Sequence, residues 1–238
     1  SGAYSLTKAG SAELTLSGAN TFSGVTVVDA GTLTLSGGSA LANSMAVTVN
    51  GSGTLKLASA EEIATLAGSG AVNLQANALT LSGSGNTAYS GVMSGSGSLV
   101  KSGSGELTLS GANTFSGGAT VSGGAVLVGN DAAFGSGTVV FSGGKIASDS
   151  ATARTVANAL GLSGTLAVGD GTNNGALTFT GSAGLSAATT LTVASAATLG
   201  GVVSGAYSLT KAGSGELTLS GANTFSGVTV VDAGTLTL

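Results

Sequence analysis

Carboxylates are the residues of this chain best suited to catalysis, because polysaccharide hydrolases and lyases work with them. A glycosidase needs two carboxyl groups that face one another about 5–10 Å apart. Glu61 and Glu62 are the only adjacent pair, and adjacent residues on a strand point to opposite faces. Ser59 instead fits a capping box with Glu62 at a short helical turn. No catalytic pair is therefore expected among the ten carboxylates, which are Glu13, Asp29, Glu61, Glu62, Glu106, Asp131, Asp149, Asp170, Glu216 and Asp232.

The remaining side chains add little catalytic chemistry. The chain has no histidine and no cysteine, which excludes Cys/His zinc sites, thiol chemistry, disulfides and histidine-based acid–base catalysis. Arg154 is the only arginine, and a lyase would place it near a base. The residues beside Arg154 offer no such base, so we expect a solvated surface residue. The protein is not expected to be an enzyme.

One segment is rich in oxygen ligands and could be considered for calcium. Residues 169–175 read Gly-Asp-Gly-Thr-Asn-Asn-Gly, but Asp170 is their only carboxylate. The nonapeptide series of calcium-binding solenoids is absent, and Asp-Gly and Asn-Gly are common in turns. The many G-x-G strings would need a following helix to bind phosphate, and none is predicted. We expect no catalytic, cofactor-binding or metal-binding residue, and no cofactor.

Four residue types recur in three copies of one motif. Each lysine precedes a glutamate by five residues, which duplication of the motif explains; an exposed Lys–Glu pair contributes at most about 1 kcal/mol. The asparagines lie 93 and 110 residues apart, too far to stack, so each is expected to bond to the backbone of its own turn. The phenylalanines are expected to cover the core beside those turns. The residues are Lys8, Lys101 and Lys211; Glu13, Glu106 and Glu216; Asn20, Asn113 and Asn223; and Phe22, Phe115 and Phe225.

The elements that hold these residues belong to a repeated sequence. Residues 1–35 and 204–238 are identical except that Ala12 becomes Gly215, which gives a period of 203 residues. A looser copy covers residues 98–128. We therefore predict that residues 1–203 form one full period of a longer tandem array. Residues 204–238 then begin the next period, continuous with the first.

Within the period, apolar residues alternate with polar ones in short segments. Pairs such as Leu14/Leu16, Val47/Val49 and Leu107/Leu109 recur every 8–11 residues or a little more, with Gly, Ser or Asn between them. Alternation with a period of two places one set of side chains on one sheet face, so the chain is predicted to be all-β, with Leu107 facing inward. The 238 residues contain no proline and no tryptophan, which argues against a β-sandwich. We predict a right-handed parallel β-helix with roughly 20–30 residues per turn, and one period of about eight to ten turns rising on the order of 40 Å.

The residues also carry a family resemblance. Residues 101–128, KSGSGELTLSGANTFSGGATVSGGAVLV, and 211–238, KAGSGELTLSGANTFSGVTVVDAGTLTL, resemble the passenger-associated transport repeat of bacterial autotransporters. The resemblance implies a right-handed parallel β-helix that is extracellular, displayed outside a Gram-negative outer membrane. The absence of cysteine agrees with a chain that is threaded through a membrane.

These observations favour a structural protein. We expect a spacer or scaffold segment of a surface fibre, which associates end to end or continues covalently into further repeats. The alternative is an adhesin module that binds a glycan or host cell surface through one face of the solenoid; long insertions would favour it, and none is apparent. A polysaccharide-active enzyme is a remote third. Only 7% of residues are charged and six are basic, so no nucleic acid partner is expected. No apolar run approaches about 18 residues, so no membrane insertion by this segment is expected.

Overall fold

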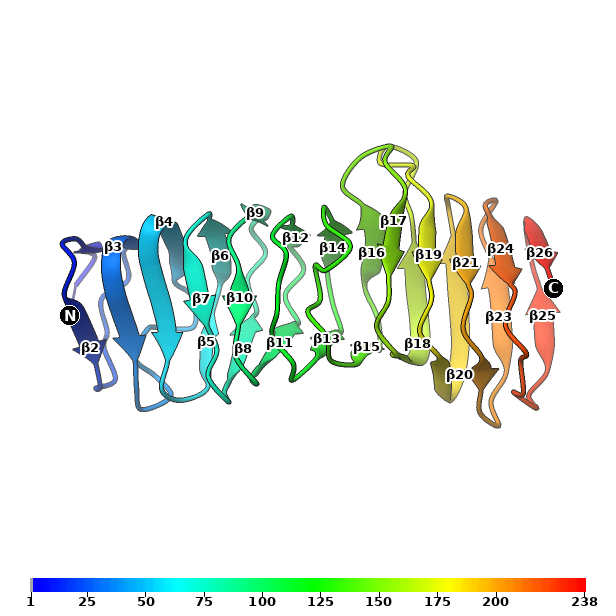
Figure 1. Cartoon of the computed structure of the whole chain (residues 1–238), viewed down its shortest axis with the longest axis horizontal. Helices are drawn as coiled ribbons and strands as arrows, with labels where there is room; N and C mark the ends of the chain where they lie inside the picture. Colours follow the sequence, from blue (N-terminus) through cyan, green and yellow to red (C-terminus); the bar gives the residue numbers. More distant parts are fainter. Residues whose placement is uncertain (1) are drawn as a thin grey trace.

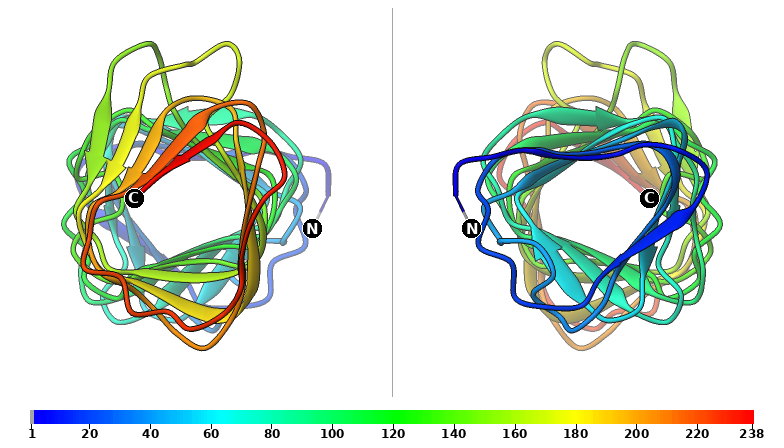
Figure 2. Two further views of the ribbon diagram at one scale, coloured as in Figure 1. Left: turned by 90° about the vertical axis from the view of Figure 1, so that its right-hand side faces the viewer. Right: turned by 90° about the vertical axis from the view of Figure 1, so that its left-hand side faces the viewer.

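The chain coils into a parallel β-solenoid of about 12 turns, as the computed structural model of residues 2–238 shows (Figure 1). Every regular element in this part of the chain is a β-strand. Seen with the C-terminal end toward the viewer, the chain advances counter-clockwise, so the coil is right-handed (Figure 2). The predicted right-handed parallel β-helix is confirmed.

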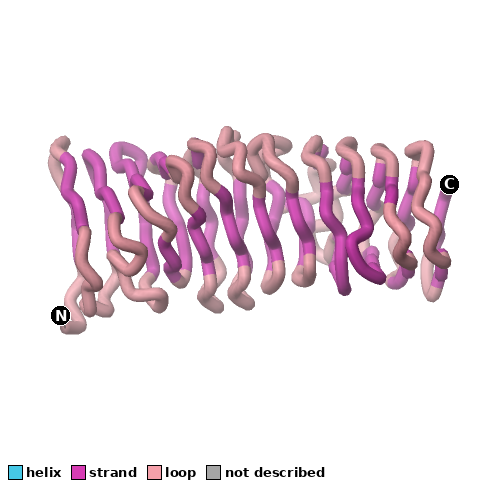
Figure 3. The backbone as a smooth tube through the Cα atoms, turned by 90° about the horizontal axis from the view of Figure 1, so that it is seen from below, coloured by secondary structure: helices cyan, strands magenta, loops and turns pink. Residues whose placement is uncertain are grey.

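The strand pairings divide the wall of the solenoid into three sides. Figure 3 shows how the strands stack turn on turn along the axis. Side 1 contains β1 (Leu6–Lys8), the start of β3 (Thr26–Leu35), the start of β4 (Ala46–Leu57), β6 (Thr65–Gly68), β9 (Thr87–Tyr89), β12 (Glu106–Leu109), β14 (Ala125–Val128), β16 (Lys145–Ser148), the end of β18 (Leu160–Val168), the end of β20 (Ala183–Val193), β23 (Leu209–Ala212) and β25 (Thr229–Val231).

Side 2 begins with β2 (Glu13–Leu16), the ends of β3 and β4, β7 (Ala71–Asn73) and β10 (Met93–Ser94). It ends with β17 (Arg154–Val156), β19 (Leu177–Phe179), β21 (Ala197–Leu199), β24 (Glu216–Leu219) and β26 (Thr235–Thr237). Side 3 contains β5 (Glu61–Ile63), β8 (Ala78–Leu81), β11 (Ser98–Lys101), β13 (Ala119–Val121), β15 (Val139–Phe141), the starts of β18 and β20, and β22 (Val203–Ser204).

One sequence period makes ten turns. Ten successive parallel pairings lead along side 1 from β1 to β23, whose residues are the 203-residue counterparts of β1. A turn therefore takes about 20 residues, the lower end of the predicted range. Since neighbouring strands lie about 4.8 Å apart, one period rises about 48 Å.

The interior is a continuous column of aliphatic side chains with a few aromatics. Leu107 is buried with 1% of its surface exposed, so its predicted inward orientation is confirmed. Phe134 and Phe141 pack edge to face inside the wall, with ring centroids 6.3 Å apart and planes at 86°. Stacking of such residues from turn to turn buries apolar surface that a single turn cannot cover.

Two loops project from the otherwise even wall (Figures 1 and 2). Residues 149–153 connect β16 to β17, and residues 169–176 connect β18 to β19 one turn later. These loops are short insertions, because the turns that carry them take 22 and 25 residues instead of about 20. Polar residues with a strong preference for turns, such as Asp170 and Asn173, fill the longer loop.

Among the described residues, no helix has the length and apolar character needed to cross a membrane.

Candidate functional site

The three repeated lysines are buried in the wall of the solenoid. Lys8, Lys101 and Lys211 expose 6%, 4% and 0% of their surface. The prediction of exposed ion pairs with the glutamates five residues later is therefore wrong. Those glutamates lie outside the wall, where Glu13 accepts a hydrogen bond from Thr34 Oγ1 at 2.5 Å and Glu106 lies 3.8 Å from the Lys145 ammonium.

Each buried ammonium is held by backbone carbonyls at a corner. Lys8 Nζ donates to Ala9 O at 3.0 Å, to Gly10 O at 2.8 Å and to Ala30 O at 2.9 Å. The first two carbonyls belong to its own corner and the third to the corner of the next turn. An ammonium has three donors, so all of its hydrogen-bonding capacity is used.

Lys211 repeats this arrangement, whereas Lys101 repeats only the bond to its own corner. Lys211 Nζ donates to Ala212 O, Gly213 O and Ala233 O at 3.0, 2.7 and 2.9 Å. Lys101 Nζ donates to Gly103 O. Burial lowers the pKa of Lys101 and of Lys211. Such amines are candidates for base or Schiff-base chemistry, but all three donate hydrogen bonds to carbonyl groups. Lys8 and Lys211 in addition act as clamps between the corners of neighbouring turns.

A glycine completes each lysine corner. Gly31, Gly124 and Gly234 lie 23 residues after the respective lysines and have φ of +68°, +64° and +70°. A Cβ at these positions would lie 2.7 to 2.8 Å from the lysine Nζ. The constant spacing from lysine to glycine is the signal in the sequence that could have revealed the clamp.

The repeated asparagines also bond from turn to turn. Asn113 Oδ1 accepts from Met93 N at 2.8 Å, and its Nδ2 donates to Ala133 O at 2.6 Å, 20 residues away on each side. Asn20 Nδ2 donates to Gly18 O and to Ala40 O, both at 2.9 Å. The predicted bonds to backbone are confirmed, but most of their partners lie in neighbouring turns rather than in the asparagine's own.

The repeated phenylalanines belong to the core, as predicted. Phe115 is fully buried, while Phe22 and Phe225 are partly buried and pack against the core cluster.

Glu61 is a buried carboxylate that caps a neighbouring corner. It exposes 3% of its surface and accepts hydrogen bonds from Ala40 N at 3.2 Å and Leu41 N at 2.7 Å. Burial raises the pKa of Glu61, although these two bonds act in the opposite direction. Glu62 lies on the other face of the same strand, β5, so the expected helical turn capped by Ser59 is wrong. Pairing of β5 with β8 makes this segment a strand.

The longer projecting loop is closed by turn chemistry. Asp170 Oδ1 accepts from Thr172 N at 2.9 Å and Asn173 N at 2.5 Å, and Oδ2 lies 3.0 Å from Lys145 Nζ. Burial would raise the pKa of Asp170, but the bonds from Asn173, Lys145 and Thr172 outweigh it and lower the pKa. Within residues 2–238 no group of three or more acidic, histidine or cysteine side chains is arranged to hold a metal ion.

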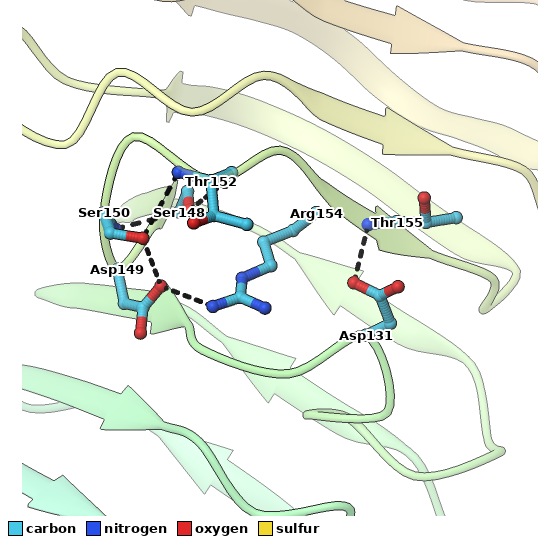
Figure 4. Close-up of polar contacts among 7 residues, drawn as sticks. All are labelled: Asp131, Ser148, Asp149, Ser150, Thr152, Arg154 and Thr155. Carbon is cyan, nitrogen blue, oxygen red and sulfur yellow. Dashed lines mark hydrogen bonds and ion pairs between the residues drawn. The ribbon is translucent and has the colours of Figure 1, made fainter.

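Arg154 braces the shorter loop from inside (Figure 4). Its Nη2 lies 3.0 Å from Asp149 Oδ1, and its side chain is only 21% exposed. The expectation of a solvated residue without a base nearby is wrong, because the loop folds back and brings Asp149 beside the guanidinium. Ser150 Oγ also donates to Asp149 Oδ1 at 3.1 Å, and Asp131 Oδ1 accepts from Thr155 N at 3.0 Å.

Two open grooves lie on the outer surface. One of about 620 Å³ is lined by polar side chains that include Lys56, Asn73 and Gln75. The other, of about 440 Å³, lies beside the shorter loop and includes Asp131 and Asn158. Neither lining contains the two carboxylates that glycoside hydrolysis uses. The side chains of the repeated motif therefore join turns together, and the grooves show no catalytic constellation.

The comparisons with known proteins agree with this structural role. The family model described as passenger-associated-transport-repeat matches residues 6–40, 99–128 and 209–238. No curated protein and no solved structure matches the chain. The three matched segments contain the lysine, asparagine and phenylalanine copies described above.

Proposed function

Because the chain carries three passenger-associated transport repeats on one continuous solenoid, we propose that it is a spacer segment of an autotransporter passenger. In this role it forms part of an extracellular fibre on the surface of a Gram-negative bacterium. Its task is mechanical: it sets the distance between the membrane and whatever the fibre presents.

The observation that carries this proposal is the phase of the repeat. Lys8 and Lys211 lie on the same side of the solenoid, ten turns apart, and the strands that follow them also share a side. A whole number of turns means that the next period would continue along the same axis without a kink. Each added period would then lengthen the fibre by about 48 Å.

The contacts between turns suit a load-bearing element. Backbone ladders run along the sides, and the lysine and asparagine bonds add polar ties between corners. In solenoids each turn is stable only through its neighbours, so unfolding has to proceed from an end or break two interfaces at once. The exterior carries few charges, which leaves little basis for tight binding of charged partners.

The proposal is tested by length and by location. Proteins with one, two and three tandem periods are measured by small-angle X-ray scattering, and the expected maximum dimension grows by about 48 Å per period. Immunogold electron microscopy of intact producing cells, with serum against this segment, should place label along projections. A thin labelled layer at the outer membrane without projections would contradict the spacer role.

A second function, an adhesin module, is favoured by the two projecting loops. Residues 149–153 and 169–176 stand side by side on the wall and flank the surface where adhesion to a glycan or host cell would occur. Replacing residues 170–174 by a Gly-Ser linker should abolish cell binding if the loops form an adhesive site. Unchanged binding, or no binding by the parent protein, would rule this function out.

A further inference from the structure

Two segments of identical sequence differ in what covers them. Residues 26–35 form β3 and are covered by the next turn, whereas residues 229–238 form the last turn and are open. Val28 and Leu35 expose 0% of their surface, but their counterparts Val231 and Leu238 expose 48% and 86%. The open end is thus an apolar surface. The first copy, residues 26–35, shows how a further turn covers the same sequence.

The cover of the first copy is β4, in a defined register. Nine residue pairs link β3 to β4, from Thr26 opposite Val47 to Leu35 opposite Leu57. Beyond the ladder, Ala58 N donates to Leu35 O at 2.8 Å and Asn50 Nδ2 donates to Asp29 Oδ1 at 2.5 Å. These contacts use backbone and side-chain groups that residues 229–238 also possess.

We propose that the edge of β25 and β26 is an acceptor for a turn with the sequence of residues 36–57, supplied by the next period of the same polypeptide. This inference rests on the proposed function as a tandem spacer. The register repeats that of β3 with β4, so that Val231 lies opposite a residue equivalent to Val49, and Leu238 opposite one equivalent to Leu57. The carboxylate of Asp232 takes the place of Asp29 as acceptor for the equivalent of Asn50.

A folded second copy cannot supply this segment. Its own residues 46–57 are already held between β3 on one side and β6 and β7 on the other. The occupant must therefore be a segment that has not yet folded, which a following period provides. Addition of a strand to an open sheet edge is a general mode of recognition, in which backbone bonds give affinity and alternate side chains give specificity.

The test uses a synthetic peptide with the sequence of residues 36–57, labelled with a fluorophore, and the 238-residue chain. We expect saturable binding with one peptide per chain in fluorescence anisotropy. A peptide with Val49→Asp and Leu57→Asp should bind at least tenfold more weakly, because both side chains would enter the core.

Two variants of the chain form a matched pair. Leu238→Asp should weaken peptide binding at least tenfold, because its counterpart Leu35 becomes fully buried under the next turn. Val228→Asp should leave binding unchanged, because its counterpart Val25 is still 51% exposed in the covered copy. Both residues are largely exposed in the free chain, at 86% and 70%, so neither change should disturb its fold.

A covalent version covers the case in which the free peptide aggregates. The chain is extended at residue 238 by the sequence of residues 36–81, which corresponds to about two turns. Leu238→Asp should lower Tm of the extended protein by at least about 5 °C and leave Tm of the 238-residue chain unchanged.

No saturable peptide binding together with an equal effect of Leu238→Asp on both proteins would overturn the proposal. Concentration-dependent association of the chain that Leu238→Asp abolishes, without saturable binding of the peptide, would instead identify a second copy as the occupant. The spacer function is tested separately. If it is wrong, immunogold microscopy shows no projections on cells, whether or not the peptide binds.

Discussion

Residues 2–35 and 205–238 share a sequence except at Ala12 and Gly215, but they lie at opposite ends of the solenoid. Leu14, near the start, is 36% exposed, whereas its counterpart Leu217 is 1% exposed. The order is reversed further along, since Leu35 is fully buried and Leu238 is 86% exposed. In each case the buried member lies between two neighbouring turns, whereas the exposed one has a neighbouring turn on one side only. Burial in this protein is therefore a property of the neighbouring turn, about 20 residues away, as much as of the segment itself.

The middle copy, residues 98–128, extends this comparison because turns cover it on both sides. Its Phe115 is fully buried, while the counterparts Phe22 and Phe225 are only partly so. It also starts on another side of the solenoid: Lys101 lies on side 3, whereas Lys8 lies on side 1. The 93 residues between these lysines are not a whole number of turns. A buried lysine therefore occurs at more than one corner of the solenoid.

The largest difference in stability is expected between truncation of a leucine in a middle turn and truncation of a leucine in an end turn. Leu107→Ala should lower the free energy of unfolding by about 2–5 kcal/mol, because its side chain is buried among core residues of three turns. Leu14→Ala should cost less than about 1 kcal/mol, since its residue is 36% exposed. Equilibrium unfolding in urea measures both. Equal losses would show that end turns are as well packed as the middle.

A smaller difference is expected between two asparagines. Asn113→Ala removes the acceptor for Met93 N and should cost about 1–3 kcal/mol, because a buried donor loses its partner. Asn20→Ala, in the partly exposed first turns, should cost less than about 1 kcal/mol. Thermal unfolding of the two variants ranks them. A larger loss for Asn20→Ala would contradict the proposed dependence on neighbouring turns.

Association of the chain sharpens the contrast between open and covered ends. Exposed strand edges tend to pair with other chains, so the 238-residue chain should associate end to end at high concentration. Sedimentation velocity over a concentration series should show this, and Leu238→Asp should reduce it while Val228→Asp does not. A strictly monomeric profile at high concentration would refute the prediction.

The smallest effect concerns the corner at Ala40 and Leu41, which Glu61 caps. Burial raises the pKa of Glu61 above its ordinary value of 4.5, so the folded chain holds this proton more tightly than the unfolded chain. The contribution of Glu61 to stability is therefore fully present below the ordinary pKa and is lost as pH rises through the raised one. Glu61→Gln should flatten the part of the pH dependence in urea unfolding that lies above the ordinary pKa of 4.5. The same slope in both proteins would assign it to other groups.

The amino-acid sequence by itself determined the fold class and the period. Side chains on a strand alternate between faces, so apolar pairs such as Leu107/Leu109 point to the interior however many residues a turn takes. The near-identity of residues 1–35 and 204–238 sets the repeat at 203 residues. Phe115 could be assigned to the core because its side chain is apolar. Asn113 could be assigned to hydrogen bonds with the backbone because its amide both donates and accepts.

The tertiary structure alone decided which polar residues are buried and by what. Lys8 follows the inward alternation of its strand, yet a lysine is normally exposed, and only the carbonyls of its own and the next corner make burial favourable. Asp149 meets Arg154 because a loop folds back between two strands. In both cases the fold determines which group comes to lie beside the buried side chain. Local residue patterns do not encode this, because they do not show where the chain returns.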